Sequence, residues 1–214
     1  MGRRFNTAGP CLAAYHYMIP ALGRLPEAPD LVAQLGYFVV HAPRQTGKTT
    51  TLRALAEELT AGGVYAALHF SCEVGEALGD DLGAAQRGIL QRIRDHADIA
   101  LPLDLRPPPW PDVPDASLFA SALTAWARVC PRPLVLFFDE IDALRGASLI
   151  SVLRQLRDGY SHRPHAFPAS VALCGLRDVR DYKVASGGDP SRLGTASPFN
   201  IKLESLRLGD FTPS

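Results

Sequence analysis

The sequence predicts an α/β protein in which two layers of helices enclose a five-stranded parallel β-sheet. Short apolar runs typical of buried strands alternate along the chain with amphipathic stretches of helical period. A Gly-Lys-Thr tripeptide follows the first apolar run, and an Asp-Glu pair ends a later one. Because sites in open α/β sheets lie at the carboxyl ends of strands, both polar motifs belong to positions where chemistry is expected.

Composition indicates one soluble domain of ordinary charge. The chain has 214 residues, and 47% of them are hydrophobic, which is enough for a substantial core. Lys plus Arg and Asp plus Glu both number 22, so net charge gives no support for nucleic acid or an anionic membrane as partner. The four cysteines are far apart, which disfavours disulfides and zinc. No apolar stretch approaches the roughly 20 residues of a membrane helix. We therefore expect a cytoplasmic protein without a membrane segment.

The first 36 residues are expected to form a lead-in segment before the first strand. Residues 5–25 are rich in turn-forming residues, and residues 26–36 have the apolar spacing of a short helix.

The first strand, residues 37–40, runs into a loop that is typical of a phosphate-binding site. The chain is interrupted by a proline and becomes helical from Gly47 onward. Strand, loop, Gly-Lys-Thr and helix in this order form a P-loop, whose backbone N–H groups and helix N-terminus hold phosphate oxygens. In such a loop Lys48 reaches the β- and γ-phosphates, and the Thr49 hydroxyl binds Mg²⁺. The residues expected to hold the nucleotide are Ala42, Pro43, Arg44, Gln45, Thr46, Gly47, Lys48, Thr49 and Thr50.

One position departs from the usual pattern Gly-x-x-x-x-Gly-Lys-[Ser/Thr]. Its first glycine is replaced by Ala42. That glycine helps the chain turn away from the strand, so a small alanine is a mild change. The chemistry depends on the Gly-Lys-Thr that follows, and this is intact. The preceding strand argues against a chance occurrence of the tripeptide.

Between the two motifs the sequence predicts a strand at residues 64–74, a helix at 80–97 and another helix at 116–129. His69 lies inside the strand, where a core or edge histidine is the expected interpretation, ahead of a ligand. The stretch 98–115 contains six prolines, which exclude a continuous helix or strand. We interpret it as an extended surface spacer, with docking of a partner as the alternative.

The second motif begins with an apolar run at residue 133 and ends in Asp139-Glu140. Uninterrupted apolar runs are typical of parallel strands buried on both faces. Four hydrophobic residues followed by Asp-Glu form the Walker B pattern, in which Asp139 holds Mg²⁺ through water and Glu140 polarises the attacking water. Acidic residues often end strands, so this pair alone is weak. Together with the P-loop it predicts a site for a nucleoside triphosphate and Mg²⁺.

The last third of the chain continues the alternation. A helix is predicted at residues 144–157, a fourth strand at 169–175 and a fifth at 198–203.

Taken together, the motifs resemble those of prokaryotic AAA-type (AAA+) P-loop ATPases related to origin-recognition and STAND signalling ATPases. The resemblance covers nearly the whole chain and is found at residues 5–10, 41–49, 137–142, 175–182 and 197–208. It implies ATP and Mg²⁺ as ligands and the additional-strand type of P-loop fold. It also implies an ATPase core over residues 37–214, with a helical lid that would begin after residue 210. GTPases are disfavoured because an Asn-Lys-x-Asp motif is absent, and small-molecule kinases because they place no glutamate at position 140.

The resemblance also implies a polar residue near the end of the fourth strand that orients the attacking water. Here the strand ends in Cys174-Gly175, so either Arg177 or Asp178 takes that role or hydrolysis is slow. Arginines that could sense the γ-phosphate are Arg177 and Arg180 within the chain, and Arg157 and Arg163 toward a neighbouring subunit. Salt bridges to nearby acids are the alternative for each of them. Arg177 joins Lys48 and Glu140 as the expected catalytic residues.

The leading functional hypothesis is an ATP-binding and hydrolysing module that passes a conformational change to a protein partner or to another copy of itself. The alternatives are a nucleotide-dependent switch or scaffold without turnover, and a DNA-associated ATPase, which the net charge does not support. Four residues of the lead-in are open to two interpretations, packing on an adenine ring or capping of the sheet edge: Tyr15, Tyr17, Met18 and Ile19.

Overall fold

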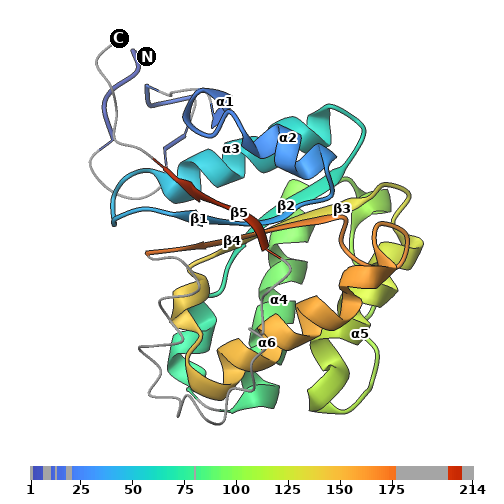
Figure 1. The fold of residues 1–214 in the computed structure, drawn as a ribbon. Helices are drawn as coiled ribbons and strands as arrows, with labels where there is room; N and C mark the ends of the chain where they lie inside the picture. Colours follow the sequence, from blue (N-terminus) through green and yellow to red (C-terminus); the bar gives the residue numbers. More distant parts are fainter. Residues whose placement is uncertain are drawn as a thin grey trace.

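The computed structural model of the chain describes residues 2–6, 11–12, 14–17, 21–79, 81–176 and 202–208. These residues form three layers, with a five-stranded sheet between two groups of helices (Figure 1). The strands are β1 (Tyr37–His41), β2 (Ala66–Ser71), β3 (Leu134–Asp139), β4 (Ser170–Gly175) and β5 (Lys202–Arg207). Every strand pair in this sheet is parallel, which confirms the predicted fold class.

The strand order is β2-β3-β4-β1-β5, so β4 lies between the strand before the P-loop and the strand that ends in Asp139. This is the additional-strand arrangement. The register aligns the carboxyl ends of the strands, because Val40 is opposite Cys174 and Ser71 is opposite Asp139. Since all strands point the same way, the segments that follow them gather at one edge of the sheet.

One face of the sheet is covered by α1 (Ala21–Arg24), α2 (Ala28–Ala33) and α3 (Lys48–Ala61). In α3, Leu52 and Leu55 are three positions apart and lie on the same side of the helix. Both are buried in one cluster with Phe38 and Phe137 of the sheet. This packing holds the first turn of α3 beside the carboxyl end of β1.

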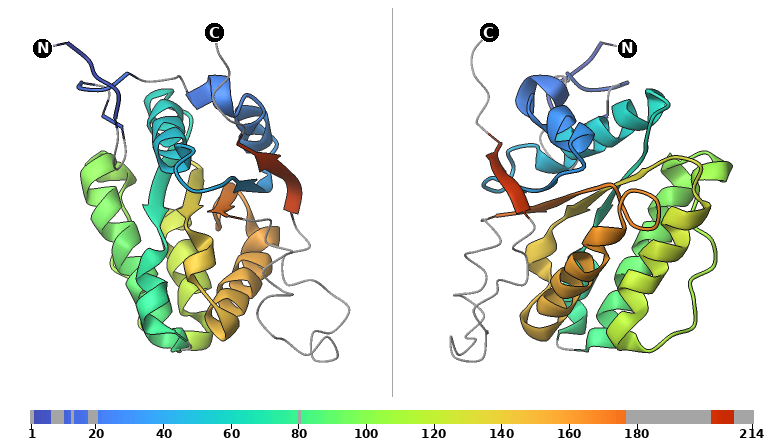
Figure 2. Two further views of the ribbon diagram at one scale, coloured as in Figure 1. Left: turned by 90° about the vertical axis from the view of Figure 1, so that its left-hand side faces the viewer. Right: turned by 45° about the vertical axis from the view of Figure 1, so that its right-hand side comes forward.

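The opposite face is covered by α4 (Leu82–Ala100), α5 (Asp115–Val129) and α6 (Gly146–Gly159), and both views in Figure 2 show the same separation of the helices. The larger core lies here. Its fully buried members include Phe119 and Trp126 of α5, Phe138 of β3 and Leu156 of α6. Helices on both faces leave β3 with no exposed side, which explains its uninterrupted apolar sequence.

The second strand is shorter than the predicted range 64–74. It ends at Ser71, and the short 3₁₀ helix η1 (Glu73–Leu78) follows. Among the described strands, β2 pairs only with β3, whose last residue Asp139 is opposite Ser71. The last backbone bond to β3 is from the Cys72 N–H to the Asp139 carbonyl at 2.8 Å. After it the backbone groups are satisfied within the 3₁₀ helix, which begins with the bond from Gly75 to the Cys72 carbonyl.

The fifth strand was predicted at residues 198–203 but is found at Lys202–Arg207. Residues 198–201 lie outside the described part of the chain. The pairing sets the position, because β5 runs beside β1 until Arg207 meets His41. Leu206 points into the core, while the next residue, Arg207, is exposed. This alternation of an edge strand is a weaker sequence signal than the apolar run just before it.

The proline-rich stretch, residues 98–115, packs against the rest of the domain. α4 continues to Ala100, beyond the predicted end of that helix, and a single 3₁₀ turn, η2 (Leu103–Leu105), follows. Leu105 is fully buried, and its carbonyl accepts a hydrogen bond of 3.0 Å from the Trp126 indole. Trp110 donates to the carbonyl of Leu90 in α4 at 3.2 Å. The interpretation as a surface spacer is therefore wrong for these residues, which close the core over α4 and α5.

Two further 3₁₀ turns follow β3 and α6, η3 (Ile141–Ala143) and η4 (Tyr160–His162). No helix within the described residues combines the length and the apolar character that crossing a membrane requires.

Candidate nucleotide-binding site

The loop between β1 and α3 has the backbone of an anion-binding turn. Gly47, which precedes α3, has φ 80° and ψ 21°, and Gln45 also has a positive φ of 62°. Glycine adopts this left-handed conformation without the steric penalty that other residues meet. Among the described residues, no side chain caps the N-terminus of the 14-residue helix α3. The first backbone N–H groups of α3 are thus available to an anion, and the helix dipole favours one.

Lys48 folds back over this loop. Its Nζ donates to the carbonyl oxygens of Ala42 and Pro43, both at 2.7 Å. The ammonium group therefore lies within the turn formed by residues 42–47. A positive charge held there, beside the open helix N-terminus, is suited to phosphate oxygens.

The lead-in segment forms hydrogen bonds to the P-loop and to the first turn of α3. Arg24 of α1 donates to the carbonyl of Thr46 at 2.6 Å and to the Thr51 hydroxyl at 3.3 Å. The backbone N–H of Cys11 donates to the Thr50 hydroxyl at 3.2 Å. The residues before the first strand thus help to fix the shape of the P-loop, a role that the sequence did not indicate.

The two tyrosines of the lead-in lie largely at the surface of the described structure. Tyr15 and Tyr17 are 55% and 56% exposed, and Tyr17 packs on Phe5 with ring centroids 5.0 Å apart. Met18 and Ile19 lie outside the described residues. The adenine interpretation of this group stays a prediction.

Asp139 lies at the centre of the site, at the end of β3, and is only 2% exposed to solvent. Its Oδ2 accepts a hydrogen bond of 2.6 Å from the Thr49 hydroxyl and has a 3.1 Å contact with Nε2 of His69. Its Oδ1 accepts from the backbone N–H of Glu140 at 3.0 Å. The structure therefore brings the metal-ligand candidates of the two motifs into direct contact.

The environment of Asp139 favours the ionised carboxylate. Burial raises the pKa of Asp139, but hydrogen bonds from His69 and Thr49 act in the opposite direction. The net effect is a pKa below the ordinary value for this side chain. Asp139 is consequently negative at neutral pH.

The residues present fit a magnesium ion. A hydroxyl and a carboxylate are oxygen donors of the kind that Mg²⁺ prefers, and Mg²⁺ is usually held by one or two protein groups together with substrate phosphates. Within the described residues there is no cluster of three or more His, Cys, Asp or Glu that could hold a metal alone. Thr49 and Asp139 would form the protein part of a nucleotide–Mg²⁺ site.

Glu140 leaves the strand in an unusual conformation. It is exposed, and its φ of 55° and ψ of 41° lie in the left-handed region, which is uncommon for a residue with a side chain. Its Oε2 accepts a hydrogen bond of 2.5 Å from the Ser71 hydroxyl, whose oxygen accepts from the backbone N–H of Glu73 at 3.1 Å. The Glu140 carboxylate is thereby held toward the end of β2.

Ser71 was missed in the sequence. The signal that could have found it is its place at the end of the second strand, where a polar side chain faces the Asp-Glu pair once β2 and β3 are adjacent.

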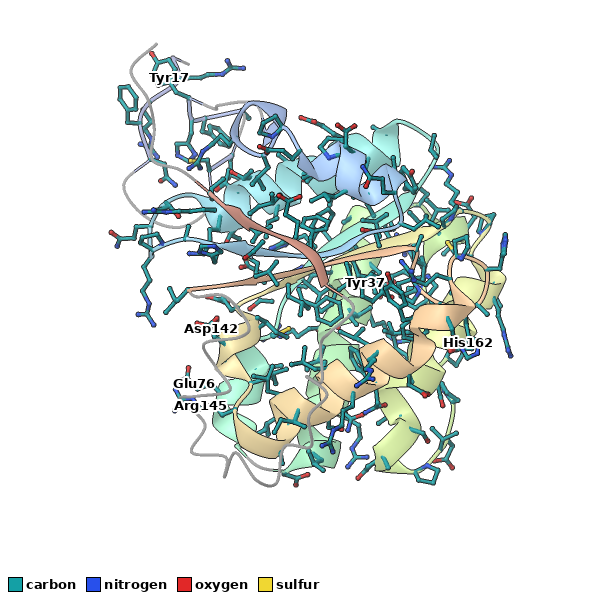
Figure 3. The ribbon with its side chains drawn as sticks, viewed as in Figure 1. Tyr17, Tyr37, Glu76, Asp142, Arg145 and His162 are labelled. Carbon is teal, nitrogen blue, oxygen red and sulfur yellow. The ribbon has the colours of Figure 1, made fainter. Side chains whose placement is uncertain are left out.

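An ion pair joins the segments that follow β2 and β3. Arg145 donates to Glu76 at 2.9 Å, linking the residue before α6 to η1. Figure 3 shows these two residues together with Asp142 on one side of the molecule, away from Tyr37 and His162. Both segments that carry Ser71 and Glu140 are thus connected beyond the site as well.

The tip of β4 carries a thiol. Cys174 is fully buried near Asp139. Burial and the negative charge of Asp139 raise the pKa of Cys174 well above its usual value, so the thiol is neutral. The described residues place no Asn, Ser or Thr at this strand end, and Arg177, Asp178 and Arg180 lie outside them.

Arg163 makes its described contacts within the chain, and its reach toward a neighbouring subunit stays a prediction. Its guanidinium lies 3.4 Å from the centroid of the Tyr160 ring and donates to the carbonyl oxygens of Leu35 and Tyr160. Leu35 precedes β1, so these contacts are at the amino ends of the strands, opposite the P-loop. Arg157 is exposed on α6, and the structure does not test its role.

Comparison with known proteins finds structural neighbours without sequence relatives. No family model matches the chain, and no curated protein matches it. A chain in the structure of Drosophila ORC bound to poly(dA/dT) DNA and Cdc6 is similar over 89% of this chain and 29% of that one, with TM-score 0.54 and 12% identity. Cdc6p from Pyrobaculum aerophilum is similar over 87% and 44%, with TM-score 0.53 and 17% identity. A Walker-type ATPase of Pyrococcus abyssi is similar over 88% and 52%, with TM-score 0.51 and 14% identity.

At these identities the similarity shows the fold. The chain has the α/β fold shared by these ORC, Cdc6 and Walker-type ATPase structures, as expected from the resemblance of its motifs. It spans 29%, 44% and 52% of the length of the three matched chains.

Proposed function

We propose that the chain is an Mg²⁺-dependent ATP-binding and ATP-hydrolysing module. The observation that supports this most directly is the 2.6 Å hydrogen bond between Thr49 and Asp139. It joins the first turn of α3 to the end of β3, although the two residues are 90 positions apart in the sequence. Two motifs that were recognised independently meet at one point, with an open helix N-terminus and a lysine beside them.

Each residue has a role that follows from its place. The loop of residues 42–50 and the N-terminus of α3 bind the phosphates, and Lys48 neutralises the charge on the β- and γ-phosphates. Thr49 and Asp139 would hold Mg²⁺, which supplies further charge neutralisation when bound. Glu140 polarises the attacking water, so that positioning and electrostatics account for the catalysis.

Three parts of the proposal rest on the sequence resemblance. ATP is preferred to GTP because the Asn-Lys-x-Asp motif is absent and a fold neighbour is a Walker-type ATPase. Arg177 would sense the γ-phosphate from the segment after β4. The output would be a conformational change passed to a protein partner or to a second copy of the chain.

Two observations favour a second candidate function, a nucleotide-dependent switch without turnover. The Glu140 carboxylate is held by Ser71 at 2.5 Å. The tip of β4 carries the neutral thiol of Cys174 where related ATPases have a polar residue. In this alternative the chain holds ATP or ADP, and the state of the nucleotide alone carries the signal.

The test is ATP turnover by the purified chain with ATP binding measured alongside. We expect Lys48→Ala to abolish nucleotide binding and Glu140→Gln to keep binding while turnover disappears. Glu73→Gln is the matched control, since it makes the same chemical change on an exposed residue of η1. Turnover by Glu140→Gln at the parent rate would show that Glu140 does not activate water. Binding without turnover in the parent would support the switch.

DNA association has only indirect support. One structural neighbour comes from a complex that contains DNA, whereas this chain has equal numbers of acidic and basic residues. Retention on DNA that weakens steeply with salt would indicate a DNA-associated ATPase.

A further inference from the structure

His69 lies next to the site but has no part in the roles given above. It is the fourth residue of β2 and lies opposite Phe137 of β3. Two positions further along the strands, Ser71 lies opposite Asp139. From there its ring reaches diagonally across the strand pair to Asp139, with 3.1 Å between Nε2 and Oδ2. A histidine inside an apolar strand therefore contacts the carboxylate at the centre of the site.

The contact is buried on both sides. The side chain of His69 is 8% exposed and that of Asp139 is 2% exposed. A buried carboxylate needs donors to both oxygens, since each donor that is missing leaves part of the desolvation cost uncompensated. His69 is packed edge-on against His96 of α4, with ring centroids 6.3 Å apart. The imidazole is thus held in a packed environment with its Nε2 toward Asp139.

The three donors to Asp139 differ in what else they do. The backbone N–H of Glu140 serves only Oδ1, while Thr49 and His69 both serve Oδ2. Thr49 is itself a proposed ligand of the cation. His69 is therefore the side-chain donor to Oδ2 that has no second role, and it is suited to fix the carboxylate plane whether or not the cation is bound.

We propose that His69 is a positioning residue for the divalent cation: by donating from Nε2 to Oδ2 it holds the Asp139 carboxylate in the orientation in which Asp139 and Thr49 together bind Mg²⁺. The inference rests on the proposed nucleotide–Mg²⁺ site and deepens it. Partners that orient a metal ligand in this way typically change metal affinity by about 10–100-fold when they are removed.

The experiment compares His69→Leu with His69→Gln. The amide nitrogen of glutamine lies at a reach similar to that of the imidazole Nε2 and can donate to Oδ2, whereas leucine cannot. His69→Asn is a second polar variant whose amide is too short, in case leucine prevents folding. His96→Phe is the matched control, because it removes the neighbouring histidine, keeps an aromatic ring against His69 and leaves the hydrogen bond to Asp139 in place. Thermal melting establishes that each variant is folded.

The measurement is the affinity for a fluorescent ATP analogue, first in EDTA and then over a series of Mg²⁺ concentrations. We expect His69→Leu and His69→Asn to require about 10–100-fold more Mg²⁺ for the same enhancement of binding, with unchanged affinity in EDTA. His69→Gln should restore most of the parent response, and His96→Phe should match the parent.

Four results would overturn the proposal. An unchanged Mg²⁺ midpoint in His69→Leu and His69→Asn would show that the hydrogen bond does not position the ligand. An equal loss of affinity in EDTA and in Mg²⁺, or a His69→Gln variant as impaired as His69→Asn, would show a purely structural role. A parent chain whose nucleotide binding is absent or independent of Mg²⁺ would defeat the proposed function and this inference with it. A Mg²⁺-dependent parent with unaffected variants would defeat the inference alone.

Discussion

Replacing Gly159 by alanine tests the packing of the end of α6 against the segment that precedes β4. Gly159 is buried at the end of α6, and an added Cβ would lie far inside van der Waals contact with the ring of Phe167. Phe167 is fully buried in the larger core, so its ring has no free space to move into. The backbone of Gly159 is helical, with φ −73° and ψ −11°, and alanine adopts it without strain. The overlap with Phe167 alone should therefore decide the result.

The magnitude follows from the cost of overpacking. An extra methyl group in a well-packed core typically costs about 1–3 kcal/mol. For a domain of this size each kcal/mol lowers the melting temperature by about 2–4 °C, so we expect a decrease of about 2–12 °C.

Gly62→Ala is the matched control. Gly62 follows α3 with φ −63° and ψ −10°, and an added Cβ would lie 3.5 Å from the nearest atoms, which is an ordinary contact. A compatible Gly→Ala change stabilises by about 0.4–1 kcal/mol, because the unfolded chain loses conformational freedom. Urea and thermal unfolding followed by circular dichroism would compare the two variants. Equal stability of Gly159→Ala and Gly62→Ala would refute the packing described for Phe167.

Three further changes test the site and the proline-rich stretch. Ser71→Ala should leave ATP affinity unchanged and raise steady-state turnover by about tenfold at most, because it frees Glu140 from a hydrogen bond of about 1.5 kcal/mol, the low end of the range for bonds to charged groups; a decrease in turnover would contradict this. Asp139→Asn should lower the free energy of unfolding at neutral pH. The folded-state pKa of Asp139 is depressed, so its contribution is complete above the unfolded value of about 4 and is lost as pH falls through the folded value. Urea unfolding should therefore show the difference from the parent shrinking below about pH 4, and a constant difference would argue against a depressed pKa. Trp126→Phe removes the hydrogen bond to the Leu105 carbonyl and part of a buried ring, and should cost about 1–3 kcal/mol in thermal unfolding.

The sequence was sufficient for the sheet and for the two motifs because these depend on local patterns. The run 133–138 is apolar at every position since β3 is covered on both faces. Gly47 is recognisable because a left-handed turn before a helix needs a glycine. Local patterns predict the ends of strands less well, because pairing with the neighbouring strand determines where a strand begins and ends. The ends of β2 and β5 are set by Asp139 and His41 on neighbouring strands.

The donors around the acidic pair could not be predicted from local patterns. Ser71 and His69 contact Glu140 and Asp139 only because β2 is parallel to β3 in one particular register. A shift of one residue would turn both side chains to the other face of the sheet. Arg163 is a second case in which the sequence alone does not show the contacts. It lies in a loop, but its guanidinium packs on an aromatic ring and donates to carbonyl oxygens at the amino ends of the strands.

The contact between Ser71 and Glu140 also bears on the choice between an ATPase and a switch. Hydrogen bonds to charged groups typically contribute about 1.5–3 kcal/mol. Glu140 is exposed, so water competes for its carboxylate and the low end of this range, about 1.5 kcal/mol, applies. Breaking such a bond slows a reaction by at most about tenfold. A positioned general base typically contributes about 10²–10⁴-fold. The Ser71 hydrogen bond can therefore slow the use of Glu140 but is too weak to prevent it. By this comparison the observed geometry favours a hydrolysing module whose rate is restrained at Ser71 over a site in which Glu140 is permanently blocked.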